Sequence, residues 1–179
     1  APNAGRSDWF GNALAMTESA LAVGAYGESS CESYVSELAG ADTGCPSAGA
    51  VFLFVRAGEA LNASWRFDSY VKAPNNDAGG KGAAGKTAAA GFVDGDSFGW
   101  AVALTADALA VGASYESSCS TQVSAVASAH KHACPRAGAV YVYVRRGGEW
   151  RFDAYLKAPN AGSLHFFGVA LALAADTLA

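Results

Sequence analysis

The feature that most constrains the fold of this chain is an internal repeat. The segment "FGNALAMTESALAVGAYGESSC" aligns without a gap with "FGWAVALTADALAVGASYESSC", and "FGVALALAADTLA" begins a third copy. Further along each unit, "GAVFLFVR" matches "GAVYVYVR", and "WRFDSYVKAPN" matches "WRFDAYLKAPN". Two units and the start of a third therefore account for nearly all 179 residues, which predicts one supersecondary unit used repeatedly. The shared tags are "APN", at Ala1, Ala73 and Ala158, and "FG", at Phe10, Phe98 and Phe167.

Each unit contains four candidate β-strands. The first runs from "FG" to about Met16 or Leu104, and a short turn joins it to the second, "ALAVGA". The third, "AVFLFV" or "AVYVYV", is apolar on both faces, which is typical of a strand buried between layers. Long helices have little room in this pattern, and the best helical candidate is the short segment from Val123 to His132.

The fourth strand candidate alternates strictly between apolar and polar side chains. We predict that Trp65, Phe67 and Val71 lie on one face of it, with Trp150 and its neighbours repeating the arrangement. The opposite face is most simply a solvated one, although tyrosine and arginine are also favoured in contacts between subunits. The side chains predicted on that face are Arg66, Asp68, Tyr70 and Lys72.

The four cysteines lie at equivalent places in the two units. Pairing Cys31 with Cys45 and Cys119 with Cys134 closes two loops of similar length, and each second cysteine is followed by proline. We expect two disulfides, because the flanks are polar and rich in serine; free buried thiols are the alternative. Disulfides imply an oxidising compartment, so the expected location is extracellular or at the cell surface.

Four short strands repeated every 70 to 90 residues or so are typical of β-propeller blades. The ordered motifs "FG", "ALAVGA", "GAVYVYVR" and "W" resemble the FG-GAP repeat of the propeller head of integrin α chains. This resemblance implies an all-β fold of four-stranded antiparallel blades. The expected boundaries are 1–75 for blade 1, 76–97 for an insertion loop, 98–160 for blade 2 and 161–179 for the start of blade 3.

The chain departs from that family in two ways. Many FG-GAP blades carry a D-x-D-x-D-G calcium loop between their first two strands, but here the position holds "TESA", "TADA" or "AADT". Too few oxygen ligands remain, so no metal site is expected. A propeller ring also needs at least four blades. We therefore expect either a fragment of a longer repeat protein or a subunit completed by further copies, as in a ring or a fibre.

A nucleotide-binding motif in the insertion is better explained by chance. The stretch "GGKGAAGKT" matches the G-x-x-x-x-G-K-[ST] pattern, but neither a buried strand before it nor a helix after it is predicted. The units that lack the insertion also lack the motif. We expect no nucleotide and no other cofactor, and the insertion should be an exposed, removable loop.

Other candidate chemistry is equally weak. The group "HKHAC" offers His130, His132 and Cys134 to a metal, but a solvated loop and a disulfide explain it better. The "DGD" stretch ending at Asp96 is most simply a turn. The motif "ESSC" could supply a catalytic serine, such as Ser117 or Ser118, or a catalytic glutamate, Glu28 or Glu116. The motif occurs in both units, which favours a structural role, since catalysis needs only one copy. We therefore predict that the chain is not an enzyme.

Charge and one sequon bear on possible partners. The net charge of −4 and the absence of basic runs argue against nucleic acid, and no apolar run is long enough to span a membrane. Asn62 begins "NAS", an acceptor sequence for N-glycosylation, and we expect it on an exposed hairpin tip. The alternative is an acceptor sequence that carries no glycan. The expected function is that of an extracellular structural or adhesive module binding protein or glycan partners and assembling with further copies or blades. The alternatives are a non-catalytic piece of a secreted propeller enzyme and a soluble glycan-binding module.

Overall fold

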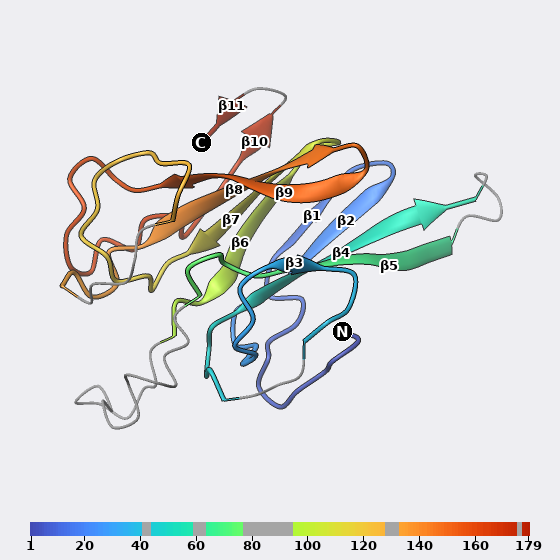
Figure 1. Cartoon of the computed structure of the whole chain (residues 1–179), viewed down its shortest axis with the longest axis horizontal. Helices are drawn as coiled ribbons and strands as arrows, with labels where there is room; N and C mark the ends of the chain where they lie inside the picture. Colours follow the sequence, from blue (N-terminus) through green and yellow to red (C-terminus); the bar gives the residue numbers. More distant parts are fainter. Residues whose placement is uncertain (41–43, 59–63, 77–94, 128–132, 175–176) are drawn as a thin grey trace.

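The computed structural model describes residues 1–40, 44–58, 64–76, 95–127, 133–174 and 177–179. Over these residues the fold is all-β without helix: two antiparallel sheets pack face to face, and a small hairpin lies beyond the second (Figure 1). The phosphate-loop match, Asn62 and both His130 and His132 fall outside the described residues.

The first sheet is built from the first unit. Its strand order is β1-β2-β4-β5-β3, and each neighbouring pair is antiparallel. The strands are β1 (Leu14–Met16), β2 (Ala20–Ala25), β3 (Val35–Ser36), β4 (Ala50–Ala57) and β5 (Ser64–Val71).

The second sheet repeats this plan in the order β6-β7-β8-β9, and the third unit contributes one hairpin. The registers correspond, since Ala25 pairs with Ala50 in the first sheet and Ala113 with Ala139 in the second. The strands are β6 (Phe98–Leu104), β7 (Ala108–Ala113), β8 (Ala139–Arg146) and β9 (Glu149–Leu156), with β10 (Leu173–Ala174) and β11 (Thr177–Leu178) in the hairpin.

A β-bulge in β5 overturns the predicted alternation of the fourth strand. Phe67 and Ser69 pair with adjacent residues of β4, so Asp68 is an extra residue between them. An extra residue reverses which face the following side chains take. Tyr70 consequently lies on the same face as Phe67, and both pack with Phe52. A bulge at the equivalent place in β9 shows that it belongs to the repeat.

The predicted solvated face of the fourth strand is therefore wrong in its second half. Tyr70 and Lys72 are fully buried, with exposures of 0% and 1%. Arg66, which precedes the bulge, is exposed as predicted. Trp65 was expected on a buried face but is 44% exposed, because the packing between sheets that buries its counterpart Trp150 has no equivalent at Trp65 among the described residues.

The helical prediction for Val123 to His132 is also wrong in its described part. Ser124 forms an isolated antiparallel bridge with Tyr155, donating its backbone N–H to the Tyr155 carbonyl at 2.9 Å and accepting the reciprocal bond at 2.8 Å. The segment adds to the edge of β9 because its backbone groups find partners there.

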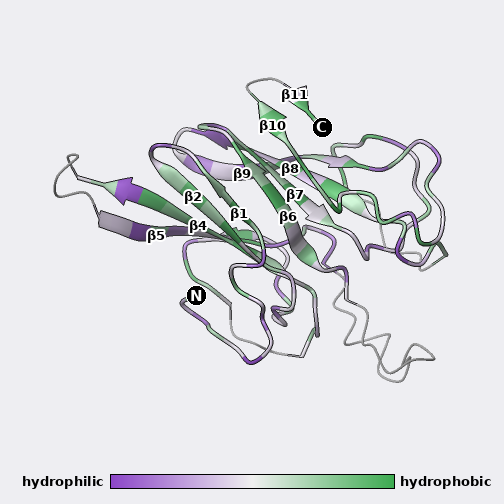
Figure 2. Ribbon diagram, turned by 180° about the vertical axis from the view of Figure 1, so that it is seen from behind, coloured by the Kyte–Doolittle hydropathy of each residue, from purple (hydrophilic) through white to green (hydrophobic). Residues whose placement is uncertain are grey.

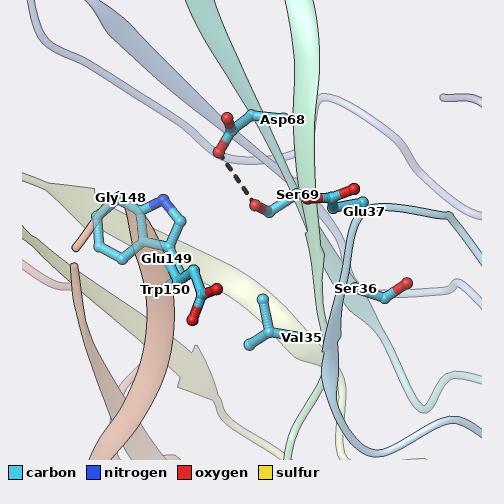
Figure 3. Close-up of a pocket in the computed structure, with 8 residues that line it drawn as sticks. All are labelled: Val35, Ser36, Glu37, Asp68, Ser69, Gly148, Glu149 and Trp150. Carbon is cyan, nitrogen blue, oxygen red and sulfur yellow. Dashed lines mark hydrogen bonds between the residues drawn. The ribbon is translucent and has the colours of Figure 1, made fainter. Parts of the chain in front are cut away.

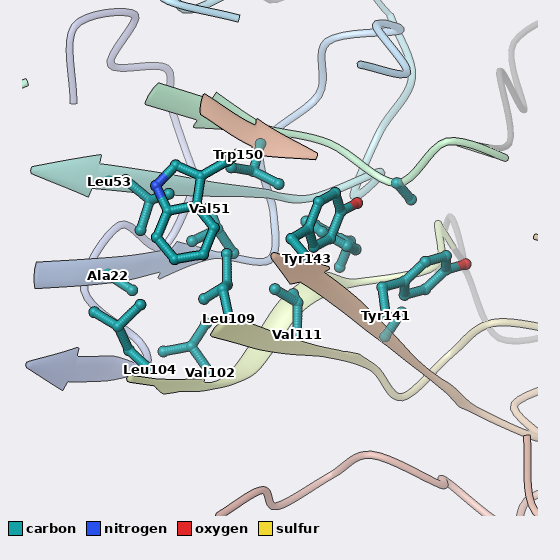
Figure 4. Packing of buried hydrophobic residues seen from close by; sticks show 14 of the residues in the cluster. Ala22, Val51, Leu53, Val102, Leu104, Leu109, Val111, Tyr141, Tyr143 and Trp150 are labelled. Carbon is teal, nitrogen blue, oxygen red and sulfur yellow. The ribbon is translucent and has the colours of Figure 1, made fainter. Parts of the chain in front are cut away.

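The main core lies between the two sheets (Figure 4). The facing surface of the first sheet has small and medium side chains, such as Ala22, Val51 and Leu53, whereas the second sheet contributes larger ones. Figure 2 shows β1, β2, β4, β6, β7 and β8 as mainly hydrophobic ribbons, with a hydrophilic end to β4, whereas β5 and β9 are largely hydrophilic. The labelled core residues of the second sheet in Figure 4 are Val102, Leu104, Leu109, Val111, Tyr141, Tyr143 and Trp150.

The junction between the first and second units is repeated between the second and third. Phe98 forms a parallel bridge with Gly49 of the first unit, and Phe167 forms the same bridge with Gly138 of the second. Each phenylalanine also donates its backbone N–H across the junction. The acceptors are the carbonyls of Ala48, at 3.3 Å from the Phe98 nitrogen, and Ala137, at 2.9 Å from the Phe167 nitrogen.

The glycine of each "VGA" is required by this junction. A Cβ on Gly24 would collide with the backbone oxygen of Gly99, and one on Gly112 would collide with that of Gly168. The "FG" glycine of one unit thus lies directly against the "VGA" glycine of the unit before it. These motifs recur because they join neighbouring units at backbone contact distance.

Both predicted disulfides are present. Cys31 is bonded to Cys45 and Cys119 to Cys134, with Cα–Cα distances of 5.2 and 5.1 Å. The first lies in the long segment between β2 and β4, and the second in the long segment between β7 and β8. Two disulfides are consistent with an extracellular protein.

Candidate functional site

A groove runs along the junction of the two sheets and borders their shared core, which contributes Trp150 and Tyr143 to its lining. Its first half is a pocket of about 260 Å³ between the segment around β3 and the turn that joins β8 to β9 (Figure 3). Both units contribute to it, so neither forms it alone. The lining residues are Val35, Ser36, Glu37, Asp68 and Ser69 from the first unit and Gly148, Glu149 and Trp150 from the second.

The second half of the groove is an adjoining pocket that shares Val35 and Trp150 with the first. Its volume is also about 260 Å³, and its lining is more aromatic. We call the two pockets together the inter-unit groove. The further lining residues are Ser33, Tyr34, Lys72 and Pro74 from the first unit and Tyr143, Arg151 and Phe152 from the second.

Trp150 forms the wall common to both halves of the groove. It follows the tight glycine turn at the start of β9, and its side chain is only 5% exposed. The guanidinium of Arg145 lies over its ring, 5.8 Å from the centroid, and also lies 3.9 Å from the Asp68 carboxylate of the first unit. The cation therefore holds the indole in place and links the two units.

Carboxylates gather at the first half of the groove. Asp68 accepts a hydrogen bond of 3.0 Å from the Ser69 hydroxyl, and Glu149 accepts one of 2.8 Å from the exposed Arg151 guanidinium. Among the residues that the structure describes, no group of three or more His, Cys, Asp or Glu side chains is placed to hold a metal ion. These oxygens are instead suited to accepting hydrogen bonds from hydroxyl or amide groups of a ligand.

Tyr34 marks the open edge of the second half. Its ring is 55% exposed, and the negative charge of Glu32 raises the pKa of its hydroxyl above the ordinary value of 10.0. The phenol therefore stays protonated at neutral pH and can donate a hydrogen bond. A groove with aromatic walls and a few hydrogen-bonding groups is a common form of binding site for small or extended ligands.

Each unit also contains a buried ion pair that sequence reasoning missed. Lys72 lies 2.7 Å from Glu28 in the first unit, and Lys157 lies 2.5 Å from Glu116 in the second. All four side chains are buried. The sequence analysis assigned Glu28 and Glu116 a structural role but did not identify their lysine partners. The usable signal was the pair of identical "Y-x-K" endings to the fourth strands.

A tyrosine and a serine complete each ion-pair cluster. The hydroxyls of Ser30 and Tyr70 lie 2.5 Å apart, and those of Ser118 and Tyr155 lie 2.7 Å apart. Burial first, and then the charge of the glutamate, raises the pKa of both tyrosines well above the ordinary value. Such groups resemble acid–base machinery, but their burial and their duplication indicate that they fasten the second-to-third-strand loop onto the sheet.

The remaining candidates from the sequence are not brought together. Cys134 is in a disulfide, and the Ser117 hydroxyl donates to the backbone carbonyl of Tyr115 at 3.0 Å. Asp96 is buried, 5% exposed, in the segment that precedes β6. The described parts of the chain hold no helix long and apolar enough to cross a membrane.

Comparisons with protein-family models, with curated proteins and with solved structures find no match to this chain.

Proposed function

We propose that this chain is part of an extracellular structural or adhesive protein built from FG-GAP-like, β-propeller-type blades. It binds protein or glycan partners in the inter-unit groove. The repeat, the family resemblance of its motifs and the two disulfides support this proposal.

The observation that carries the binding role is the position of the inter-unit groove. Its walls come from two units, which are held together by the shared core and by the backbone bridge between Gly49 and Phe98, and the ion pair between Arg145 and Asp68 crosses between them. A site made by two neighbouring units exists only when the units are stacked. The packing that builds the fold therefore also builds the binding site. This is how repeat proteins generally form their binding surfaces.

The lining of the groove favours hydroxyl-rich or amide-rich partners. The exposed ring of Tyr34 offers apolar surface against a wall formed by the buried Trp150, while Glu37, Glu149 and Arg151 offer acceptors and donors at the rim. Sugars and extended peptides both present apolar faces bordered by hydrogen-bonding groups. Exposed polar groups of this kind give specificity more than affinity, so a weak, multivalent interaction is expected.

A soluble glycan-binding module is the second candidate. The combination of an exposed tyrosine, a fixed tryptophan and rim carboxylates favours it. The two candidates differ in whether the native protein is retained on a surface or in a fibre. Electron micrographs and fractionation of native material distinguish them.

Binding is tested with the full chain on a glycan array and on plates coated with extracellular-matrix proteins. Replacing Tyr34 and Arg151 by alanine should lower binding to the responding probe by at least about tenfold, the effect of losing about 1.4 kcal/mol. The matched control is Arg146→Ala, because Arg146 is exposed on the same hairpin but does not line the groove. Equal loss in the control, or unchanged binding in the double variant, contradicts the assignment of the groove.

A further inference from the structure

The second unit presents a face to the first that is fully covered. We call this the leading face of a unit, because it faces the unit that precedes it in the chain. Phe98, Val102, Leu104 and Trp150 of the second unit lie on it, with exposures of 0%, 8%, 9% and 5%. They pack against the alanine-rich surface of the first sheet (Figure 4).

The same face of the first unit is open at the four aligned positions, although Phe52 and Tyr70 on that face are buried. The aligned positions hold Phe10, Leu14, Met16 and Trp65, which are 42%, 63%, 70% and 44% exposed. These four positions are thus apolar, as in the second unit, but no other part of the described chain covers them. Figure 2 shows β1 as a hydrophobic strand. Soluble proteins rarely leave such a contiguous apolar face in water unless it is an interaction site.

The backbone of the first unit already has the conformation found at both junctions. The "FG" glycines Gly11, Gly99 and Gly168 have φ values of +92°, +88° and +82°. A Cβ on Gly99 or Gly168 would meet backbone atoms of the preceding unit, whereas one on Gly11 would meet nothing within 4 Å. The space beside Gly11 is therefore empty, whereas the backbone of the preceding unit occupies the equivalent space beside Gly99 and Gly168.

The segment that leads into the first unit matches the docked segment that leads into the third. "APNAGRSDWFG" and "APNAGSLHFFG" have the same length. Ser7 and Trp9 have φ values of 67° and 56°, and the aligned Leu164 and Phe166 have 64° and 54°. Positive φ is uncommon outside glycine, so its recurrence at two aligned positions marks one shared conformation. In the third unit, that conformation carries Phe167 onto the second sheet.

We propose that the leading face of the first unit docks a further four-stranded unit of the same repeat type. Continuity with the two existing junctions identifies the occupant. It presents an alanine-rich strand whose "VGA" glycine lies against Gly11, as Gly24 lies against Gly99. Medium-sized side chains like Val51 and Leu53 cover Leu14 and Met16. The inference depends on the alignment of the units and not on the ligand of the inter-unit groove, so either proposal can fail alone.

The test adds one unit and follows the only methionine of the chain, Met16. A second copy of residues 1–72, carrying Met16→Leu, is placed directly before Ala1 of the full chain, which recreates the natural "VKAPN" sequence at the seam. The rate of Met16 oxidation by hydrogen peroxide is then measured by mass spectrometry. We expect it to fall at least tenfold relative to the 179-residue chain, because the docked unit covers the thioether.

Two controls keep the result interpretable. Gly24→Val in the added copy blocks the close backbone approach and should restore fast oxidation of Met16. A second extended chain uses residues 98–157 as the added unit and should protect Met16 in the same way. Fast oxidation in both extended chains, when each added unit has formed its disulfide and contributes its β-sheet circular dichroism, overturns the proposal. So does slow oxidation that persists in the Gly24→Val extension.

Discussion

The two complete units have nearly the same strands but different surroundings, and the difference shows which side chains respond to a neighbour. In the second unit, the leading face is packed against the first unit; in the first unit, its positions in and beside β1 and at Trp65 are exposed. Where the first unit has Phe52 and Phe54, the second has Tyr141 and Tyr143. The tyrosine hydroxyls donate across the junction to the Asn75 side chain and to the Lys72 carbonyl, at 2.8 and 2.7 Å.

The two units thus share the interactions that stabilise a single unit and differ in those that stabilise the junction between units. The disulfide and the buried glutamate–lysine pair occur in both units, so they stabilise the unit itself. On the leading face, Phe52 and Tyr70 of the first unit are already buried, whereas the positions aligned with Phe98, Val102, Leu104 and Trp150 are buried only in the second unit. Variants at aligned positions should therefore have equal effects inside the units and unequal effects on the leading faces.

The largest effect is expected at the buried ion pairs. Lys157→Met leaves the Glu116 carboxylate buried without its lysine and should lower the free energy of unfolding by about 3–5 kcal/mol. Lys72→Met should cost a similar amount in the first unit. Urea unfolding followed by circular dichroism measures both. The double variant Glu116→Leu with Lys157→Met should recover most of the loss, because no isolated charge remains; if it is as unstable as the single variant, the charge explanation is wrong.

The disulfides should rank next and should again be equivalent. Their sequence separations are 14 and 15 residues, and a loop of that size corresponds to about 3 kcal/mol. Replacing both cysteines of either pair by serine should therefore lower the stability by about 3 kcal/mol in urea. A clear difference between the two pairs would show that the units do not carry equivalent loops.

The leading faces should respond unequally. Leu104→Ala removes a buried side chain at the junction and should cost about 2–3 kcal/mol. Met16→Ala is the aligned change on the open face and should alter the stability of the 179-residue chain by less than about 0.5 kcal/mol. Thermal and urea unfolding of the two variants provide the measurement. A large loss from Met16→Ala would mean that this face is already covered.

The smallest effect concerns the tyrosines of the junction. Tyr143→Phe removes one buried hydrogen bond to the Lys72 carbonyl and should cost about 1 kcal/mol. The reciprocal change, Phe54→Tyr, places a hydroxyl on the open face and should be nearly neutral. Comparable losses in the two variants, measured by urea unfolding, would contradict the distinction between the faces.

Alkaline pH should destabilise the folded chain through the buried tyrosines of the junction, Tyr141 and Tyr143. Burial raises the pKa of Tyr141 and Tyr143 well above the ordinary value of 10.0, so the folded state holds their protons more tightly than the unfolded state. This stabilisation is complete below pH 10 and decreases as the pH rises above it. Exposed tyrosines such as Tyr34 ionise without unfolding, so the absorbance at the phenolate band should rise in two phases, of which only the later one accompanies the loss of circular dichroism above about pH 10. If Tyr141→Phe and Tyr143→Phe leave that later phase unchanged, these rings do not cause the alkaline unfolding.

Much of the local structure could be predicted from the sequence because it depends on neighbouring residues. The strands follow from hydrophobic patterns and turns, and the cysteine pairs follow from equivalent loops. The fourth strand could be predicted only up to Asp68, because the bulge there depends on how β4 and β5 pair and not on either strand alone. The segment after Val123 was assigned wrongly because its pairing with Tyr155 is a contact between distant residues.

The candidate site was less predictable still. Trp150, Asp68 and Arg145 meet only because two units are stacked, and no single motif encodes that distance. The partner of Glu28 was missed since the alternation past the bulge placed Lys72 on the wrong face.

The sequence by itself determined the repeat, the all-β strands and the cysteine pairing, since each depends on spacing and periodicity along the chain. Only the tertiary structure decided which faces are covered, which charges are buried together and where a groove forms. Those properties arise from the stacking of one sheet on another, in which the glycines of "VGA" and "FG" allow backbone contact between residues as distant as Gly24 and Gly99. Identical motifs thus acquire different environments according to their place in the stack.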